Sequence, residues 1–208
     1  MTNIDTEHLD HYGSFEAIQN AFLEFTNKIP FYGFSVLCAD DPHVQKLISS
    51  LDRKVVTYGL KGSFDYSAHN VVSDPNGMAF NAFQKEKKLG EMHIRLRGHH
   101  NVSNAMAAVA VGIEFGISFE QIQKALKEFR GIHRRFEHVG EVNGITVVDD
   151  YGHHPNEIQA VLSAARGAWP DRRVIALFQP HRYTRTRDLL EKFFEAFDEA
   201  DQLALLPI

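Results

Sequence analysis

Two loops of this chain concentrate side chains that could do acid–base or phosphate chemistry. The first reads DDYGHHP, residues 149–155, and follows a β-branched run. The second reads QPHRYTRT, residues 179–186, and follows another apolar run. Carboxylates accept hydrogen bonds from hydroxyl groups, whereas the planar guanidinium groups of arginine suit phosphate or carboxylate. Together the loops predict a crevice for a substrate with hydroxyl and carboxylate groups, handled beside a nucleotide.

Each loop also has a structural interpretation. Asp149 and Asp150 could simply end a strand, and His154 could do no more than cap a helix that begins at Pro155. A metal shared by His153 and His154 is not favoured, because helical ligands usually lie four residues apart. Function is favoured because both loops follow strands, and open parallel sheets bind ligands at the carboxyl ends of their strands.

Two further candidates lie elsewhere in the chain. His8, with Glu7 and Asp10 nearby, could hold a divalent cation, although the spacing is a weak signal. Asn101 and Asn104 lie three residues apart and share a face of a predicted helix. An amide offers the donor and acceptor needed to read a base edge such as adenine. The alternative role for Asn101 and Asn104 is helix capping. Without other information, the sequence favours capping over adenine binding.

The elements that must position these residues are those of an α/β protein. Strands over 34–38 and 54–59, with a helix over 14–28 before them and one over 43–51 between them, predict a parallel sheet. Short strands over 64–97 predict an antiparallel meander. Two more helices are predicted over 100–116 and 118–129, the second with a Ser118–Gln121 capping box.

Beyond a joint at residues 131–140 a new unit begins, with the order β-β-α-β-α-β of a doubly wound sheet. Its predicted elements are strands over 136–142 and 145–150, a helix over 155–169, a strand over 172–178, a helix over 186–200 and a strand over 201–208. Asn143-Gly144 is a type I′ turn signal between the first two strands. We therefore expect two domains, 1–130 and 131–208.

Composition places limits on the class of protein. The 208 residues are 44% hydrophobic and 24% charged, which is typical of globular domains. A net charge of −5 argues against nucleic acid as the main partner. We expect no membrane-spanning segment and no secretory signal. The single cysteine, Cys38, lies in an apolar run and is expected to be buried, which fits a reducing cytoplasm.

Six stretches of the chain, taken together, resemble the Mur ligase family, the ATP-dependent amide-forming enzymes of peptidoglycan synthesis. They are NIDTEHLDHYGSFE, ADDP, GHHNVSNAMAAVAVG, GIHRRFEHVGE, VVDDYGHHPNEI and FQPHRYTRT. The resemblance covers nearly the whole chain. It implies an α/β fold with part of a central ATPase-type domain over 1–130, then part of a Rossmann-like C-terminal domain over 131–208.

Within the family, DDYGHHP and FQPHRYTRT are most similar to the ligase that joins L-alanine to UDP-N-acetylmuramate. This similarity implies that ATP phosphorylates the muramyl carboxylate, the amine of L-alanine attacks the acyl phosphate, and phosphate leaves. It also implies Mg²⁺, which neutralises the transferring phosphoryl group, so that catalysis is mostly positioning and charge stabilisation.

The resemblance implies a role for each matched residue. It assigns His8 to magnesium, Asn101 and Asn104 to adenine, Arg135 to the ATP phosphates and Asp150 to the ribose. Five residues are assigned to the amino-acid and acyl-phosphate site: Tyr151, His153, His181, Arg182 and Arg185. Of these, His153, Arg182 and Arg185 are expected to act in catalysis.

The chain also departs from the family pattern. The phosphate-binding loop GxxGK[ST] is absent, and the nearest string is GLKGS at 59–63. The glutamate that partners the magnesium histidine and the UDP-sugar-binding domain are also absent from these residues. We therefore expect an internal piece of a ligase that is inactive alone.

Three other functions stay open. A sister ligase would attach a peptide to recycled UDP-N-acetylmuramate, and a comparison of L-alanine with a tripeptide would distinguish it. A non-catalytic remnant would bind adenine nucleotide or a partner protein. A metal-dependent phosphohydrolase would use the Asp/His cluster and release phosphate without an amine acceptor, although the arginine loop favours ligation.

Overall fold

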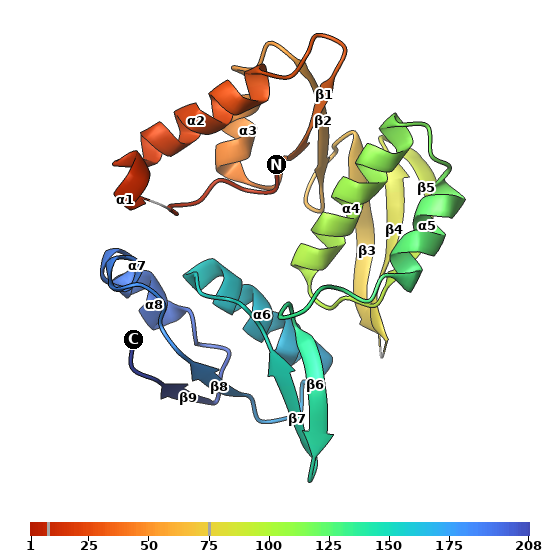
Figure 1. Ribbon diagram of the computed structural model, residues 1–208. Coiled ribbons are helices and arrows are strands. Elements are labelled where there is room, and N and C mark those ends of the chain that lie inside the picture. Colours follow the sequence, from red (N-terminus) through yellow and green to blue (C-terminus); the bar gives the residue numbers. More distant parts are fainter. Residues whose placement is uncertain (8, 75) are drawn as a thin grey trace. The chain divides into compact units, whose positions relative to one another are not determined.

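A computed structural model describes residues 1–7, 9–74 and 76–208 (Figure 1). His8, the predicted magnesium ligand, lies outside the described residues. The chain divides into two compact units. Unit 1 comprises 1–72, 79–93 and 101–127, and unit 2 comprises 73–78, 94–100 and 128–208. Both units mix helices with strands, as the sequence predicts for an α/β protein.

A five-stranded sheet in the order β1-β2-β3-β4-β5 organises unit 1. Its strands are β1 (Phe34–Cys38), β2 (Lys54–Gly59), β3 (Tyr66–Asp74), β4 (Gly77–Gln84) and β5 (Lys87–Ile94). The pairs β1–β2 and β2–β3 are parallel, which confirms the predicted parallel sheet. Only two residues separate β4 from β5, and so short a connection joins antiparallel neighbours.

Local capping signals define the helices of unit 1. These helices are α1 (Leu9–Tyr12), α2 (Phe15–Asn27), α3 (Pro42–Ile48), α4 (His99–Glu114) and α5 (Phe119–Glu128). Ser14 Oγ accepts a hydrogen bond from Ala17 N–H at 3.1 Å, and so caps α2 as predicted. Ser118 and Gln121 exchange two 3.3 Å hydrogen bonds, which confirms the predicted capping box before α5.

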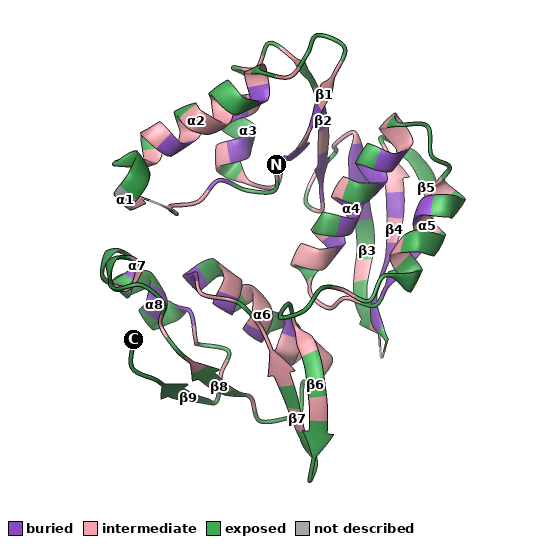
Figure 2. Ribbon diagram, viewed as in Figure 1, coloured by how far each residue is buried: buried purple, intermediate pink, exposed green. Residues whose placement is uncertain are grey.

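The core of the β1–β2 part of unit 1 joins helices to the sheet. Ile18 of α2, Leu37 of β1 and Val44 of α3 are almost fully buried in one cluster. Cys38 is buried and not disulfide-bonded, as its apolar surroundings predict. Figure 2 shows buried segments in α2 and α3. Burial of such an apolar cluster is the main source of stability for the packing of α2 and α3 on β1.

The described residues of unit 2 form two small sheets and the helices that pack on them. The strands β6 (Glu137–Val142) and β7 (Ile145–Asp149) pair antiparallel, whereas β8 (Ile175–Phe178) and β9 (Gln202–Leu205) pair parallel. Asn143 and Gly144 have φ of 51° and 75°, as a type I′ turn requires. The helices are α6 (Pro155–Ala168), α7 (Tyr183–Asp188) and α8 (Leu190–Glu195).

The structure of unit 2 differs from the prediction in two respects. The single helix predicted over 186–200 is interrupted at Leu189, whose φ of −116° is outside the helical range, so α7 and α8 are separate helices. The predicted continuous sheet is also divided, since the described residues form two hydrogen-bonded pairs, β6–β7 and β8–β9. Apart from the division of the last predicted helix into α7 and α8, the element order is the predicted β-β-α-β-α-β.

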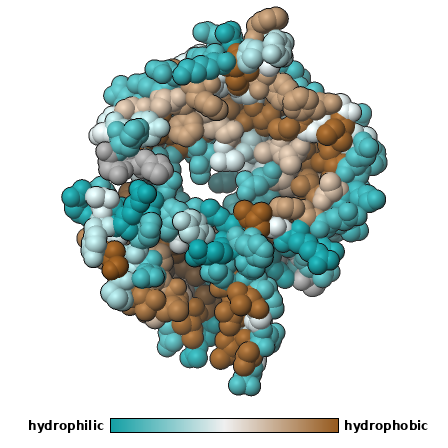
Figure 3. Space-filling view, viewed as in Figure 1, coloured by the Kyte–Doolittle hydropathy of each residue, from teal (hydrophilic) through white to brown (hydrophobic). Residues whose placement is uncertain are grey.

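Helix packing forms the core of unit 2 and leaves a strand face open. Ile158 and Leu162 of α6 pack with Leu189 and with Phe193 of α8. Several apolar side chains of the strands are exposed: Val139, Val142, Ile145, Val147, Ile175, Leu177, Leu203 and Leu205. Figure 3 shows hydrophobic patches over these strands. None of the described helices is both long enough and apolar enough to cross a membrane.

Candidate functional site

A pocket of about 650 Å³ lies in unit 2 where the chain leaves β7 and β8. Its polar lining comes from both predicted loops: Asp149, Asp150, Tyr151 and His153 from the first, and Gln179, His181 and Arg182 from the second. Its apolar lining includes Ile158, Leu162 and Phe178. The structure thus brings an acidic and a basic segment to one pocket, at the carboxyl ends of two strands.

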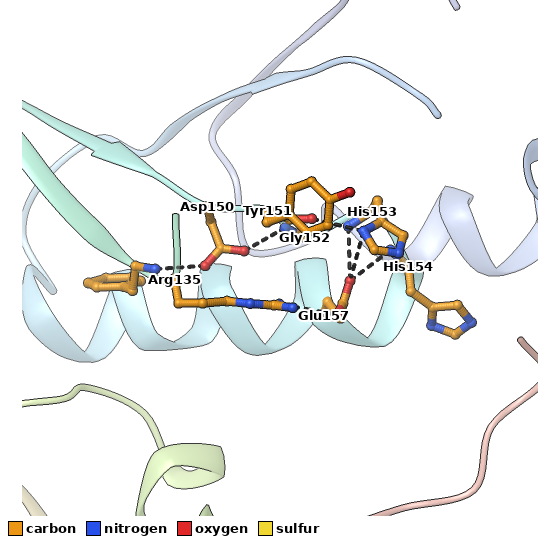
Figure 4. Close-up of polar contacts among 8 residues, drawn as sticks. Arg135, Asp150, Tyr151, Gly152, His153, His154 and Glu157 are labelled. Carbon is orange, nitrogen blue, oxygen red and sulfur yellow. Dashed lines mark hydrogen bonds and ion pairs between the residues drawn. The ribbon is translucent and has the colours of Figure 1, made fainter. Parts of the chain in front are cut away.

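Asp150 organises the first loop through both oxygens of its carboxylate. Oδ2 accepts a hydrogen bond from Phe136 N–H at 2.7 Å, and Oδ1 accepts one from Gly152 N–H at 2.6 Å (Figure 4). A Cβ atom at Gly152 would lie 3.0 Å from that Oδ1, so glycine suits this close approach. Asp150 therefore connects the 131–140 joint with the loop, in addition to the ribose role that the resemblance implies.

Glu157 is a residue of the site that the sequence analysis missed. Its Oε2 accepts hydrogen bonds from His153 N–H at 3.0 Å and His154 N–H at 3.2 Å. Its Oε1 accepts one from Arg135 Nη1 at 3.2 Å. His154 is the N-cap of α6 and Pro155 its first residue, as predicted, so Glu157 occupies the third helical position. A glutamate at this position of a capping box is the signal that could have identified it.

The charge state of Glu157 follows from its contacts. Burial acts to raise the pKa of the Glu157 carboxyl. The hydrogen bonds from His153 N–H, Arg135 and His154 N–H outweigh burial and hold the pKa below its usual value. The helix dipole at the start of α6 also favours a negative charge there. Glu157 is therefore an anion that neutralises part of the positive side of the site.

His100 is a second residue that the sequence analysis did not select. Burial lowers the pKa of its imidazole, and the nearby Asp150 carboxylate acts in the opposite direction. The Arg135 guanidinium also lowers this pKa. A neutral imidazole thus lies in the same electrostatic environment as Asp150 and Arg135. The sequence signal was available, because the adjacent histidines His99 and His100 precede the predicted asparagine pair.

The rings of Tyr151, His153 and His181 follow one another in the pocket. The Tyr151 and His153 ring centroids are 5.1 Å apart, and those of His153 and His181 are 6.5 Å apart. His153 Nδ1 lies 2.9 Å from Tyr151 O. A carbonyl oxygen only accepts, so this contact assigns the proton of a neutral His153 to Nδ1. The acceptor nitrogen is then Nε2, which is the atom that could take a proton from a substrate.

Positive charge surrounds the Tyr151 ring and continues into the second loop. The guanidinium groups of Arg134 and Arg135 lie 4.8 Å and 5.8 Å from the ring centroid, within range of cation–π interaction. Arg182 is exposed and lines the pocket, with φ of 69°. Arg185 is outside the pocket lining and donates from Nη1 to His181 O at 3.4 Å. Arg182 is thus the second-loop guanidinium best placed for an anion.

The predicted asparagine pair belongs to unit 1. Asn101 and Asn104 are inside α4, which begins at His99, so neither is the N-cap residue; Asn101 occupies the third helical position, where a side chain can still take part in a capping box. Asn101 is half-buried and Asn104 is exposed. Val102, Ala105 and Met106 form the buried side of the same helix. An exposed amide beside a packed helix face is suited to hydrogen bonding with a ligand.

The described residues do not offer a metal site. Among them, no group of three or more His, Cys, Asp or Glu side chains is arranged to hold a metal ion. The residues present in the described ranges therefore do not by themselves fit a magnesium ion.

Comparison with known proteins assigns the chain to a family. Residues 1–112 match the Mur ligase middle domain. Residues 134–207 match the domain described as Mur ligase, glutamate ligase domain. The chain belongs to the Mur ligase family. The resemblance seen in its motifs is thereby confirmed, and the two matched domains follow one another in the order that the motifs predict.

Individual relatives of the Mur ligase family agree with this assignment. A UDP-N-acetylmuramate–L-alanine ligase of Myxococcus xanthus is 49% identical over 203 residues, which is 98% of this chain and 43% of the relative. The crystal structure of a UDP-N-acetylmuramate–alanine ligase from Thermotoga maritima superposes with a TM-score of 0.78 at 28% identity. It covers 98% of this chain, which spans 44% of that structure. The chain thus spans less than half the length of these relatives.

A third relative supports the fold alone. The MurF ligase of Thermotoga maritima, solved in complex with ADP, has a TM-score of 0.83 at 18% identity. The alignment covers 99% of this chain and 47% of that structure. The α/β architecture, with its partly parallel sheet, is therefore that of Mur ligase middle and C-terminal domains.

Proposed function

We propose that this chain is part of an ATP-dependent ligase that joins L-alanine to UDP-N-acetylmuramate in peptidoglycan precursor synthesis. The observation that carries the proposal is that the two loops resembling this ligase, 149–155 and 179–186, line one pocket with acidic and basic side chains. The names of the relatives that match nearly all of the chain support the same substrates.

The proposed reaction passes through an acyl phosphate. A muramyl carboxylate oxygen attacks the γ-phosphorus of ATP, the bond from that phosphorus to the bridging oxygen breaks, and ADP leaves with the electron pair. The amine nitrogen of L-alanine then attacks the acyl carbon. A C–N bond forms, the C–O bond to phosphate breaks, and phosphate leaves with that electron pair. His153 Nε2 is proposed to receive the proton that the amine loses, and Arg182 and Arg185 to stabilise the phosphate charge.

The remaining assignments concern nucleotide and metal. We propose that Asn101 and Asn104 bind adenine, Asp150 the ribose and Arg135 the phosphates, with Tyr151 and His181 next to the amino-acid substrate. We also propose that His8 is a ligand of Mg²⁺ and that the two domains divide between residues 130 and 131. We propose a cytoplasmic location, which the free Cys38 favours.

The first test is a calorimetric titration of Mg·ATP into the chain, after circular dichroism has established that it is folded. Asn104→Ala should weaken binding by about tenfold, because a lost base-edge hydrogen bond costs about 1–2 kcal/mol. Asn20→Ala is the matched control, since Asn20 is also an exposed helical asparagine. Equal affinity of the three folded chains would contradict the adenine assignment.

The second test separates L-alanine from a peptide substrate. L-alanine and a tripeptide are each titrated into the chain, and the imidazole signals of His153 and His181 are followed by NMR. The proposal predicts that L-alanine shifts both signals. Shifts caused only by the tripeptide would favour the peptide-attaching sister ligase, and phosphate release from ATP without any amine would favour a phosphohydrolase.

A further inference from the structure

We propose that Glu157 is a positioning residue that holds the Arg135 guanidinium in place for the phosphate groups of the nucleotide. The proposal rests on the function proposed above, because it takes the phosphate role of Arg135 from there. It concerns a residue of the stretch VVDDYGHHPNEI to which the resemblance assigns no role. Three observations support it. The two carboxylate oxygens of Glu157 bind different groups, the backbone around Arg135 is fixed, and Arg135 keeps N–H donors that Glu157 does not use.

The two oxygens of Glu157 contact different parts of the site (Figure 4). Oε2 accepts from the His153 and His154 N–H groups, so it fixes the backbone at the start of α6. Oε1 accepts from Arg135 Nη1 at 3.2 Å, and Arg135 lies 22 residues earlier in the chain. One side chain thus connects the helix that follows the first loop with the joint that precedes it.

The backbone on both sides of Arg135 is held in an uncommon conformation. Arg134 and Phe136 have φ of 57° and 51°, in the left-handed region that non-glycine residues rarely adopt. Glu137 Oε2 accepts from Arg134 N–H at 2.7 Å, and Asp150 Oδ2 accepts from Phe136 N–H at 2.7 Å. Strained residues that several contacts maintain are typical of functional sites. Arg135 therefore starts from a fixed position in the chain.

The guanidinium group of Arg135 is held by its contacts and is still accessible to a ligand. Its guanidinium lies 5.8 Å from the Tyr151 ring centroid and is bonded to Glu157 Oε1. The Arg135 side chain is 46% exposed. Arginine has five N–H donors, and the bond to Glu157 uses one of them. A guanidinium held in this way needs little reorganisation to bind a phosphate group, which is the advantage of a preorganised site.

A simple helix cap is the alternative role for Glu157, and the substitution Glu157→Gln distinguishes the two. The glutamine carbonyl oxygen can replace Oε2 and keep both bonds from the loop N–H groups. Its NH₂ group then replaces Oε1 and faces Arg135 with a donor instead of an acceptor. The variant thus preserves the cap and removes the contact with the arginine.

The first measurement is the Arg135 Nε–H signal in ¹H–¹⁵N NMR spectra of the chain, assigned with Arg135→Ala. Glu157→Gln should shift or broaden this signal, whereas Glu141→Gln should not, because Glu141 is an exposed glutamate of β6. An Arg135 signal that is unchanged in Glu157→Gln would overturn the proposal. This measurement needs no nucleotide, so it tests the contact between Glu157 and Arg135 even if the proposed function is wrong.

The second measurement is the affinity for Mg·ATP in a cycle of Glu157→Gln, Arg135→Ala and the double variant. Glu157→Gln should weaken binding about threefold when Arg135 is present, the size expected for one partly exposed ion pair. It should have no further effect when Arg135 is absent. Equal weakening in both backgrounds would overturn the positioning role. Absence of binding by the unsubstituted chain would contradict the proposed nucleotide function instead.

Discussion

Asp150 Oδ2 lies 2.7 Å from Phe136 N, and this hydrogen bond connects the end of the β7 strand with the joint that precedes β6. Tyr151 N–H donates to Arg134 O at 2.8 Å beside it. The left-handed residues of the joint are therefore held by the loop that lines the pocket. The 149–155 loop and the 131–140 joint form one hydrogen-bonded structure. A substitution in either segment should therefore change the conformation of the other.

Asp150→Asn should destabilise unit 2. The asparagine oxygen can accept from Phe136 N–H or from Gly152 N–H, and the NH₂ group must then face the other donor. An unsatisfied backbone donor of this kind costs about 1–3 kcal/mol in the free energy of unfolding. Urea denaturation measures it. Asp149→Asn is the control, with an expected loss below about 1 kcal/mol, because the Asp149 side chain is 46% exposed in its ion pair with Arg134. A larger loss for Asp149→Asn would contradict this ranking.

Two glycine-to-alanine changes in unit 2 should have opposite effects. Gly144 has φ of 75° in the β6–β7 turn, so Gly144→Ala should lower the free energy of unfolding by about 1 kcal/mol. Gly167 is inside α6 and an added Cβ would meet no atom within 4 Å, so Gly167→Ala should raise it by about 0.5–1 kcal/mol. Thermal unfolding of both variants checks the signs. Destabilisation by Gly167→Ala would contradict the open surroundings of that position.

Local signals made several features predictable from the sequence. Ser14, the Ser118–Gln121 pair, Asn143-Gly144 and Pro155 each act on neighbours within four residues, so their structural effect follows from residue type and spacing. The two pocket loops also lie together as expected, although the strands that precede them, β7 and β8, belong to different hydrogen-bonded pairs in the described residues.

Features that depend on distant contacts could not be predicted. The Glu157–Arg135 bond joins residues 22 positions apart, and no periodicity signals it. Arg134 and Phe136 adopt left-handed conformations without the glycine or asparagine that usually announces one. No residue type in the sequence predicts the interruption at Leu189, since TRDLLEKFFEAF contains neither glycine nor proline. Leu189 is buried in the cluster that includes Ile158 and Leu162 of α6.

The two arginines of the second loop should respond differently to truncation. Arg182 lines the pocket and is exposed, so Arg182→Ala should weaken the binding of inorganic phosphate by about tenfold, as expected for a charged hydrogen bond of about 1.5 kcal/mol. Arg185 donates to His181 O, so Arg185→Ala should instead shift the His181 NMR signals with a smaller loss of affinity. Isothermal titration and NMR test both. Identical losses of affinity without a His181 change would contradict the assignment.

The last prediction concerns pH and the Glu157 carboxylate. Burial acts to raise the Glu157 pKa, but the hydrogen bonds from His153, Arg135 and His154 hold it below the usual value of 4.5 in the folded chain. A carboxyl group with a lower pKa when folded binds its proton more weakly there, so it stabilises the folded chain above the unfolded-state pKa. That stabilisation should be lost as the pH falls from about 4.5 through the lower folded-state pKa.

The measurement is the difference in unfolding free energy between the unsubstituted chain and Glu157→Gln, determined by urea denaturation at several pH values. Taking a difference cancels the titration of the other carboxyl groups, including Glu137 and Asp201, whose pKa values are also lowered by hydrogen bonds. The difference should be constant from pH 7 to about pH 5.5 and should decrease below about pH 4.5, because glutamine does not titrate. A difference that is the same at pH 3 and pH 7 would show that the Glu157 charge is not what the His153, His154 and Arg135 donors stabilise.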